Sequence, residues 1–243
     1  MGKKFITAIP YQNKSASRVD SLLELLAITT ENNNPYCDLC IYVRFDSKYP
    51  SEKLINRLRE KFENVKIIEA RPRIMQLLQD NFIVPYLFRQ INLYISLGKD
   101  NWENYKSVLL MDENSCPVSK NWMEILSKEW DECNCDCVGA WLPENQVIGD
   151  MTNCVGYIEQ NAMYSMNIIK NNKEICNVPN WSSWDTFYAK TFLNAGWQGT
   201  HTIRFFNRHI AQQEIDELAK KCGAVLINGV PDDSVREYFV SIK

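Results

Sequence analysis

The sequence lacks the features that mark several large classes of protein. It has no run of about eighteen apolar residues, the minimum for a membrane-spanning helix. Residues 1–10 contain two lysines but no apolar stretch long enough for a secretory signal. With 27 basic and 30 acidic residues, the chain also lacks the basic excess of nucleic-acid binders. We therefore expect a cytoplasmic protein with no membrane span and no nucleic-acid partner.

Histidine is scarce, with two copies, His201 and His209. Catalysis by a Ser or Cys nucleophile paired with histidine therefore has little support, and no serine lies in a G-x-S-x-G elbow. The nine cysteines are an odd number, and without a secretory signal we expect them to be reduced thiols.

Two groups of cysteines raise the question of a structural zinc site. Cys37 and Cys40 form a C-x-x-C pair, and a C-x-C-x-C run adds Cys133, Cys135 and Cys137. Four thiolates suit zinc. However, Cys40 falls in an expected strand, and strand alternation would turn Cys135 away from Cys133 and Cys137. Ordinary reduced cysteines are the favoured interpretation, and zinc is the alternative.

What the chain does contain is an alternation of strands and helices in its first half. Apolar patterning predicts strands at 4–10, 39–43, 65–68 and 107–111. Helical spacing predicts helices at 15–30, 51–62 and 73–97, the last bent near Pro85. Apolar strands that alternate with helices are typical of a mainly parallel sheet covered on both faces. The expected fold class is α/β and Rossmann-like.

The second half is less regular. Helices are expected at 121–130, 160–170, 184–195 and 211–222. Strands are expected at 136–141, 151–158, 200–206 and 224–227, followed by a capping tail at 231–241. The simplest arrangement is one continuous sheet in a single domain over residues 1–243.

Asp112 and Asn114 directly follow the apolar strand expected at 107–111. Ligands of open parallel sheets bind beyond the carboxyl ends of the strands, and side chains two residues apart in an extended turn can share one ligand. Carboxylate and amide oxygens suit Mg²⁺ or Mn²⁺ carrying a diphosphate. The alternative is an ordinary strand-ending turn, where Asp and Asn are common.

The segment 108–122, V-L-L-M-D-E-N-S-C-P-V-S-K-N-W, resembles the strand, DxD motif and following helix of GT-A fold glycosyltransferases. T-A-I-P at residues 7–10, leading through Arg18 into a leucine-rich helix, is similar to the family's first strand and nucleotide-binding loop. N-W-S-S-W-D at 180–185 resembles its acceptor-side segment, and I-N-G-V-P-D-D-S at 227–234 resembles its C-terminal HGxKDxS-type loop. The matches follow the family's order along nearly the whole chain.

The resemblance implies a GT-A fold and an enzyme that moves a sugar from a nucleotide diphosphate donor, such as a UDP-sugar, to a glycan hydroxyl. It implies a nucleotide-binding half at 1–114, an acceptor-side half at 115–243, and Mn²⁺ or Mg²⁺ held by Asp112 and Asn114. Frequent Asn and Lys suggest an A/T-rich genome, such as those of the large DNA viruses that encode small transferases of this kind.

Further site residues are assigned by position and by the same resemblance. Arg71 and Arg73 follow the third strand, where the family places residues near the base or diphosphate. Asp150 precedes a strand that walls the donor-sugar pocket in similar enzymes. The residues expected at the donor nucleotide are Ile9, Tyr11, Asp46, Arg71, Arg73, Asp112, Glu113, Asn114 and Asn228.

Two departures from the family pattern bear on the metal. Asn114 stands where the second carboxylate of the DxD motif is expected, and the final loop has Asn228 in place of histidine and Pro231 in place of lysine. An amide removes one negative charge from the first shell of the cation, so the metal should be weakly held without nucleotide. His201 is a candidate replacement ligand, and a structural histidine is the alternative.

Asp185 is the candidate general base. It follows Trp181 and Trp184, and desolvation beside indole rings would raise its pKa and suit proton abstraction from a sugar hydroxyl. The two tryptophans could stack on an acceptor sugar. The alternative is that Asp185 caps a helix while the tryptophans pack in the core.

Two other functions remain as alternatives. A sugar nucleotidyltransferase should carry a glycine-rich, basic loop after the first strand, whereas residues 10–14 contain Lys14 and no glycine. A catalytically inactive nucleotide- or carbohydrate-binding module is the second alternative, and Asn114 and Asn228 are the residues that favour it.

Overall fold

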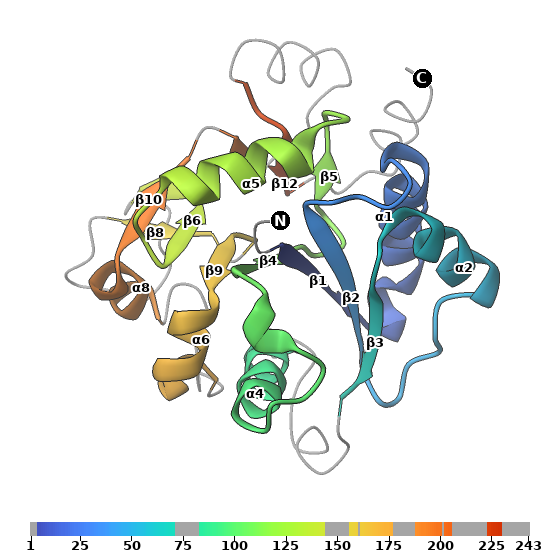
Figure 1. The fold of residues 1–243 in the computed structure, drawn as a ribbon, viewed down its shortest axis with the longest axis horizontal. Helices are drawn as coiled ribbons and strands as arrows, with labels where there is room; N and C mark the ends of the chain where they lie inside the picture. The colour runs from blue at the N-terminus through green and yellow to red at the C-terminus, as the bar shows by residue number, and fades with distance from the viewer. Residues whose placement is uncertain are drawn as a thin grey trace.

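A seven-stranded sheet forms the centre of the molecule, with strand order β10-β6-β9-β4-β1-β2-β3 (Figure 1). The computed structural model describes residues 4–70, 83–143, 156–159, 161–176, 188–200, 202–205 and 223–229. The strands of this sheet are β1 (Phe5–Tyr11), β2 (Cys37–Val43), β3 (Val65–Glu69), β4 (Ser107–Leu110), β6 (Cys137–Gly139), β9 (Met163–Ser165) and β10 (Trp197–Gly199). β9 runs antiparallel to its neighbours β4 and β6, and the other pairings are parallel. The expected α/β class with a mainly parallel sheet is confirmed.

Helices cover both faces of the sheet (Figure 1). One face carries α1 (Ala16–Thr29), α2 (Glu52–Lys61) and α5 (Trp122–Glu132), and the other carries α4 (Ile83–Ser96) and α6 (Met166–Asn171). The division follows strand alternation, because Phe5 and Ile9 of β1 pack in the first layer while Ile6 and Ala8 pack in the second. Since β1 is buried on both sides, it is apolar along nearly its whole length.

The starts of α2 and α4 show why the predicted helix boundaries lie close to the observed ones. The Ser51 side chain caps α2 by accepting a hydrogen bond from Leu54 N at 3.3 Å, as expected for a serine directly before a helix. Pro85 lies in the first turn of α4, where a missing N–H costs nothing. The helix predicted at 73–97 is thus seen as α4, and residues 71–82 lie outside the described residues.

The second half corrects two predictions. Residues 163–165 form β9, although helical spacing predicts a helix from 160 to 170, which begins only as α6. Residues 163–165 lie between β4 and β6 in the sheet and are all buried. Pairing with these two neighbouring strands outweighs the local helical spacing of the sequence. The single continuous sheet is also wrong, because the described strands form three sheets rather than one.

The additional sheets are small. A three-stranded sheet contains β11 (Ile203–Phe205), β12 (Leu226–Asn228) and β5 (Cys116–Pro117), and a two-stranded sheet contains β7 (Trp141–Pro143) and β8 (Gly156–Ile158). The strand expected at 136–141 is therefore divided between β6 and β7, and the one expected at 200–206 is described as β11 after β10. The described residues also include the short 3-10 helices η1 (Asn13–Ser15), η3 (Trp102–Asn104) and η5 (Lys173–Cys176).

Gly196 connects the helix α8 (Ala189–Ala195) to the edge strand β10. Its φ of +91° lies in the left-handed region that glycine adopts without strain. The backbone carbonyl of Gly196 accepts a hydrogen bond from Asp136 N at 3.0 Å. This turn therefore fixes β10 beside the start of β6, with which it pairs.

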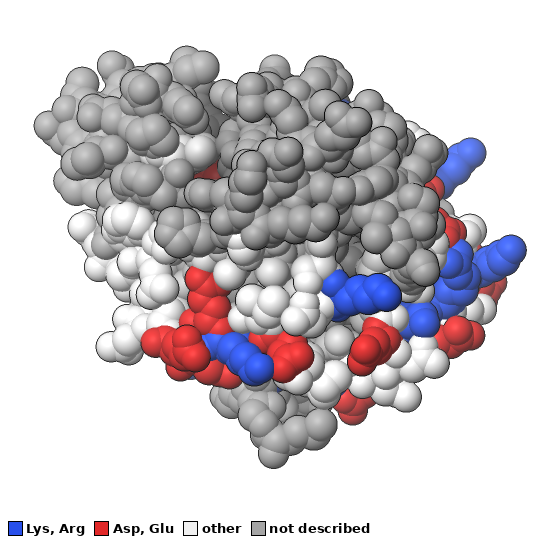
Figure 2. Space-filling view, turned by 90° about the horizontal axis from the view of Figure 1, so that it is seen from above, with Lys and Arg blue, Asp and Glu red and all other residues white. Residues whose placement is uncertain are grey.

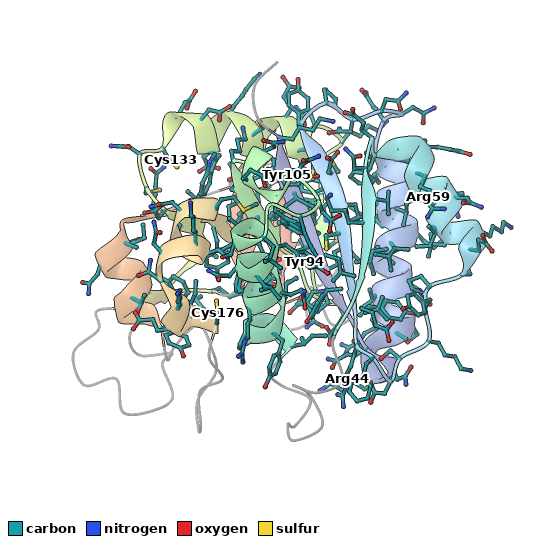
Figure 3. All side chains as sticks on the ribbon, turned by 60° about the horizontal axis from the view of Figure 1, so that its bottom comes forward. Arg44, Arg59, Tyr94, Tyr105, Cys133 and Cys176 are labelled. Carbon is teal, nitrogen blue, oxygen red and sulfur yellow. The ribbon has the colours of Figure 1, made fainter. Side chains whose placement is uncertain are left out.

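A buried polar network joins the amino-terminal ends of the strands. Asp38 is 2% exposed, and its carboxylate accepts hydrogen bonds from the Tyr105 hydroxyl and from Asn64 Nδ2, each at 2.8 Å. Lys4 Nζ lies 3.5 Å from the same carboxylate. Burial and Asp38 raise the pKa of Tyr105. Arg44, which follows β2, lies at the other end of the sheet from Tyr105 (Figure 3).

Charge on the described surface is mixed in sign. On the face shown in Figure 2, the Lys and Arg side chains lie among Asp and Glu rather than in a separate patch. Among the described helices, none has both the length and the apolar character needed to cross a bilayer.

Candidate functional site

Three loops meet at the carboxyl-terminal edge of the sheet. β1 pairs in parallel with both β2 and β4, so the chain leaves all three strands at the same edge. Asn13, after β1, joins the loop after β2: its Nδ2 donates to Asp46 O at 2.8 Å, and its Oδ1 accepts from Lys48 N at 3.1 Å. Its backbone N–H also donates to Ser47 Oγ at 3.0 Å. The two loops therefore form one structural unit.

Asp112 organises the loop after β4. Its Oδ1 accepts a hydrogen bond from Asn114 N at 2.8 Å and one from Ser115 Oγ at 3.3 Å. Ser115 is fully buried, and its Oγ in turn accepts from Asp112 N at 3.1 Å. These contacts form the strand-ending turn that the sequence allowed, and they place the partly exposed Asp112, Glu113 and Asn114 side by side at the sheet edge.

Arg18 joins this turn to helix α1. Its Nη1 donates to Asn114 Oδ1 at 3.0 Å, and its Nη2 lies 3.5 Å from Glu113 Oε1. Arg18 was not among the residues predicted at the site. Because 96 positions separate it from Asn114, no local pattern reveals the contact. The usable signal is a basic residue in the first turn of the helix that follows β1.

Glu113 is the titratable group of this turn with a perturbed pKa. Burial, followed by the nearby Asp112 carboxylate, raises the pKa of Glu113 above its usual value. Arg18 and Lys14 act in the opposite direction, since both stabilise the charged form. The turn therefore contains two carboxylates and lies within the electrostatic reach of two cations.

The other residues predicted after β1 and β2 differ in accessibility. Ile9 is fully buried and packs in the core. Tyr11 is 2% exposed, and its hydroxyl donates to Asp20 at 3.2 Å, so the ring offers little surface to a base. Asp46 is exposed, and its Oδ1 lies 2.8 Å from Arg44 Nε. Contacts of these residues with a nucleotide stay predictions.

Asn228 lies in a buried polar cluster at the end of β12. Its side chain is 0% exposed, and its Nδ2 donates to Glu159 Oε2 at 3.2 Å and to Asn161 O at 3.0 Å. Asn161 N and Nδ2 also donate to the Glu159 carboxylate, at 2.9 and 2.8 Å. Asn228 thus holds β12 against the turn after β8. The cluster was not predicted from the sequence, because Glu159 and Asn228 are 69 residues apart.

Several predicted residues lie outside the described part of the chain. They comprise the arginines after β3, the residue before the donor-sugar strand, the acceptor-side segment and the candidate histidine: Arg71, Arg73, Asp150, Trp181, Trp184, Asp185 and His201. Their proposed roles stay predictions.

The described residues do not by themselves fit a divalent cation. Asn114 Oδ1 already accepts from Arg18, and Asp112 uses Oδ1 within its own turn. The turn thus offers a metal Asp112 Oδ2 and the Glu113 carboxylate, which already lies beside the Arg18 guanidinium, whereas Mn²⁺ and Mg²⁺ require several oxygen ligands. Within the described ranges, no three His, Cys, Asp or Glu side chains lie together as a metal site.

The cysteines also do not form such a group in the described part of the chain. Cys37 and Cys40 are buried in β2, and burial raises the pKa of each thiol to about 12. Contrary to the prediction, Cys135 does not turn away from Cys133: the run is not one strand, since only Cys137 belongs to β6, and the Cys135 thiol contacts that of Cys133. Cys176 lies far from Cys133 (Figure 3).

Comparison with known proteins identifies the fold. No protein-family model matches the chain, and no curated protein matches its sequence. The galactosyltransferase LgtC, solved with donor and acceptor sugar analogues, is 10% identical with a TM-score of 0.54, and the match covers 98% of this chain and 94% of LgtC. TarS 1-349 of S. aureus is 16% identical with a TM-score of 0.53, over 81% of this chain.

A third structure is a glycosyltransferase involved in the glycosylation of the major capsid of PBCV-1. It is 11% identical with a TM-score of 0.51, and the match covers 99% of this chain and all of that one. By contrast, the chain spans only 58% of the length of TarS 1-349. Together these likenesses show that the chain has the GT-A fold of nucleotide-sugar glycosyltransferases.

Proposed function

We propose that the chain is a glycosyltransferase that moves a sugar from a UDP-sugar to a hydroxyl of a glycan acceptor. The observation that carries the proposal is the polar turn Asp112–Asn114, which lies at the carboxyl-terminal edge of a GT-A fold beside the loops after β1 and β2. Two of the similar structures support the substrate class: TarS 1-349 was also solved with UDP-GlcNAc, and LgtC was solved with donor and acceptor analogues.

The loops at the sheet edge would bind different parts of the donor. The unit formed by the loops after β1 and β2 would hold the nucleoside, as expected for this edge of the sheet. The turn after β4 would hold the diphosphate and the sugar, with Asp112 Oδ2 as an acceptor for hydroxyl groups of the donor. We propose that residues 1–243 act as one such domain, with the acceptor bound by residues after position 114.

Asp185 is the proposed general base. In an inverting reaction it would remove the proton from the acceptor hydroxyl as that oxygen attacks the anomeric carbon and UDP leaves. Asp185→Asn should then abolish transfer and leave UDP binding intact, because the amide cannot accept the proton. Unchanged turnover in this variant would restrict Asp185 to a helix cap.

The function is tested by measuring UDP release from a panel of UDP-sugars, with and without glycan acceptors. We expect release from at least one donor, and we expect Asp112→Ala to reduce the rate about a hundredfold because the turn loses its anchor and the donor is misplaced. Asp131→Ala is the matched control. Asp131 lies near the end of α5 and pairs at 2.8 Å with Lys106, which precedes β4 at the opposite edge of the sheet, so we expect no change in rate.

The same assay separates the alternatives. A nucleotidyltransferase would release pyrophosphate from a sugar phosphate and a nucleoside triphosphate, rather than UDP from a UDP-sugar. An inactive binding module would bind UDP without turning over any donor. Folded protein that neither binds UDP nor releases it from any donor would refute the proposal.

A further inference from the structure

The contact between Arg18 and the turn after β4 changes what that turn can bind. Arg18 lies in the first turn of α1, and its side chain is 38% exposed. Its guanidinium reaches both Asn114 Oδ1, at 3.0 Å, and Glu113 Oε1, at 3.5 Å. The group thus lies at the same sheet edge as the proposed diphosphate site.

Arg18 occupies oxygens that a cation would need. Asn114 stands where the DxD pattern has its second carboxylate, and its side-chain oxygen already accepts from a positively charged donor. A divalent cation placed on that oxygen would have to displace the guanidinium or lie close to another positive charge, and both are unfavourable. The triplet therefore presents an arginine where the pattern presents a second metal ligand.

The local charges are consistent with an arginine in place of a metal ligand at this turn. Asp112 and Glu113 are acidic, and Arg18 and Lys14 both lower the pKa of Glu113. A diphosphate carries negative charge of its own, and arginine recognises phosphate oxygens through paired N–H donors of fixed geometry. Helix α1 begins in the same loop and adds the positive end of its dipole.

We propose that Arg18 supplies the positive charge at the donor diphosphate that a divalent cation supplies in metal-dependent enzymes, and that it positions Asn114 away from metal binding. This inference rests on the proposed nucleotide-sugar activity. It predicts that the chain binds UDP without a divalent cation. Arg18 is a charge-supplying residue of the donor site, and Asn114 is its structural anchor.

The test is calorimetric titration of the full chain with UDP, in EDTA and in Mn²⁺. For the wild type we expect dissociation constants that agree within about threefold in the two conditions. Arg18→Ala should weaken UDP binding in EDTA about tenfold or more, because it removes a charge-assisted contact. Arg18→Lys keeps the charge but loses the paired donors, so its loss should be smaller.

Arg57→Ala is the matched control. Arg57 pairs with Glu24 between α2 and α1, away from the sheet edge, and its removal should leave UDP binding unchanged in both conditions. Far-UV circular dichroism of each variant shows whether the fold is retained. If Arg18→Ala does not fold, two measurements still test whether Arg18 or a cation supplies the charge. They are UDP binding by the wild type in EDTA and in Mn²⁺, and UDP binding by Arg18→Lys.

Three outcomes would overturn the inference. Wild-type UDP binding that improves in Mn²⁺ by clearly more than threefold would show that a cation supplies the charge, and the proposed function would stand. UDP binding by folded Arg18→Ala as tight as that of Arg57→Ala would show that Arg18 plays no part. Wild-type protein that binds no UDP in either condition would refute the proposed function itself.

Discussion

At the scale of single residues, Glu113 shows how a charge is held at the sheet edge. Its carboxylate is partly buried next to Asp112, and Arg18 offsets part of the cost. In the adjacent Asp112, one carboxylate oxygen accepts a hydrogen bond from Asn114 N within the same turn. The two neighbouring carboxylates therefore differ in their partners: Glu113 pairs with Arg18, whereas Asp112 stabilises the turn.

The raised pKa of Glu113 predicts a pH dependence of stability. Because the folded protein holds the proton more tightly than the unfolded chain, the stability from this group is present at low pH and lost as pH rises through the raised pKa. Glu113→Gln cannot ionise, so its stability relative to the wild type should increase with pH. Urea unfolding of both proteins from about pH 4 to 8 measures this difference.

Glu63→Gln serves as a control of opposite sign. The hydrogen bond and the charge of Lys4 lower the pKa of Glu63, so its contribution is present above the usual carboxyl pKa and lost as pH falls. This variant should lose stability relative to the wild type as pH rises. A difference between Glu113→Gln and the wild type that stays constant with pH would contradict the first prediction.

Single residues also show what the sequence can reveal. Asp112 and Asn114 were found because polar residues directly after an apolar strand lie at the binding edge of a parallel sheet. Arg18 was missed as a site residue because its partners lie on another element, far along the chain. Similarly, the burial of Tyr11 could not be read from its position, because odd-numbered residues of β1 face the layer that contains α1.

At the scale of elements, the short strand β12 depends on a side-chain contact as well as on its pairing. It pairs with β5 and β11, and the Asn228 amide also holds it to Glu159 and Asn161. Family resemblance suggested a nucleotide-site residue at position 228. In the structure, the amide is fully buried and donates to a carboxylate, so it stabilises β12, and a contact with the nucleotide stays a prediction.

Removing this amide should therefore destabilise the protein. Asn228→Ala leaves Glu159 with fewer donors in a buried position, and we expect the free energy of unfolding to fall by about 1–3 kcal/mol. Asn171→Ala is the control, since Asn171 is exposed on α6 and its Nδ2 donates to Asn167 Oδ1 on the same helix, at 2.6 Å. Its effect should stay within about 0.5 kcal/mol. Equal effects of both variants in urea unfolding would contradict the role of Asn228.

Elements of the first half were predictable because each follows its own pattern. Apolar runs and helical spacing indicated β1, α1, β2, α2, β3 and β4 to within a few residues. β9 was not predictable in this way, because three residues carry too little periodicity and its strand state depends on insertion between β4 and β6.

At the scale of the whole molecule, the sheet has a polar network at each end. The carboxyl-terminal edge carries the proposed site, and the amino-terminal edge carries the Asp38 network. Lys4, Asn64 and Tyr105 bring three segments onto that one carboxylate. We therefore expect that stability and binding at the proposed site can be varied independently.

Asp38→Ala tests that separation. The substitution leaves the Tyr105 hydroxyl and the Asn64 amide without their buried acceptor, and we expect a loss of about 3 kcal/mol in the free energy of unfolding. UDP binding by the folded fraction should not change, because the network lies at the opposite end of the sheet. Asp131→Ala removes the exposed partner of Lys106, which keeps its hydrogen bonds to Ser127, and should cost at most about 1 kcal/mol. A loss of UDP affinity in stable, folded Asp38→Ala would show that the two ends are coupled.

Asn13 has a consequence for engineering the specificity of this scaffold. One side chain and its own backbone N–H hold residues 46–48, so Asn13 makes three hydrogen bonds between the loops after β1 and β2. A graft that replaces either loop alone would replace one partner of each of these three bonds and leave the other loop without its template. Libraries or chimaeras that aim to change the nucleoside preference should therefore exchange residues 12–15 and 44–48 together, as one cassette.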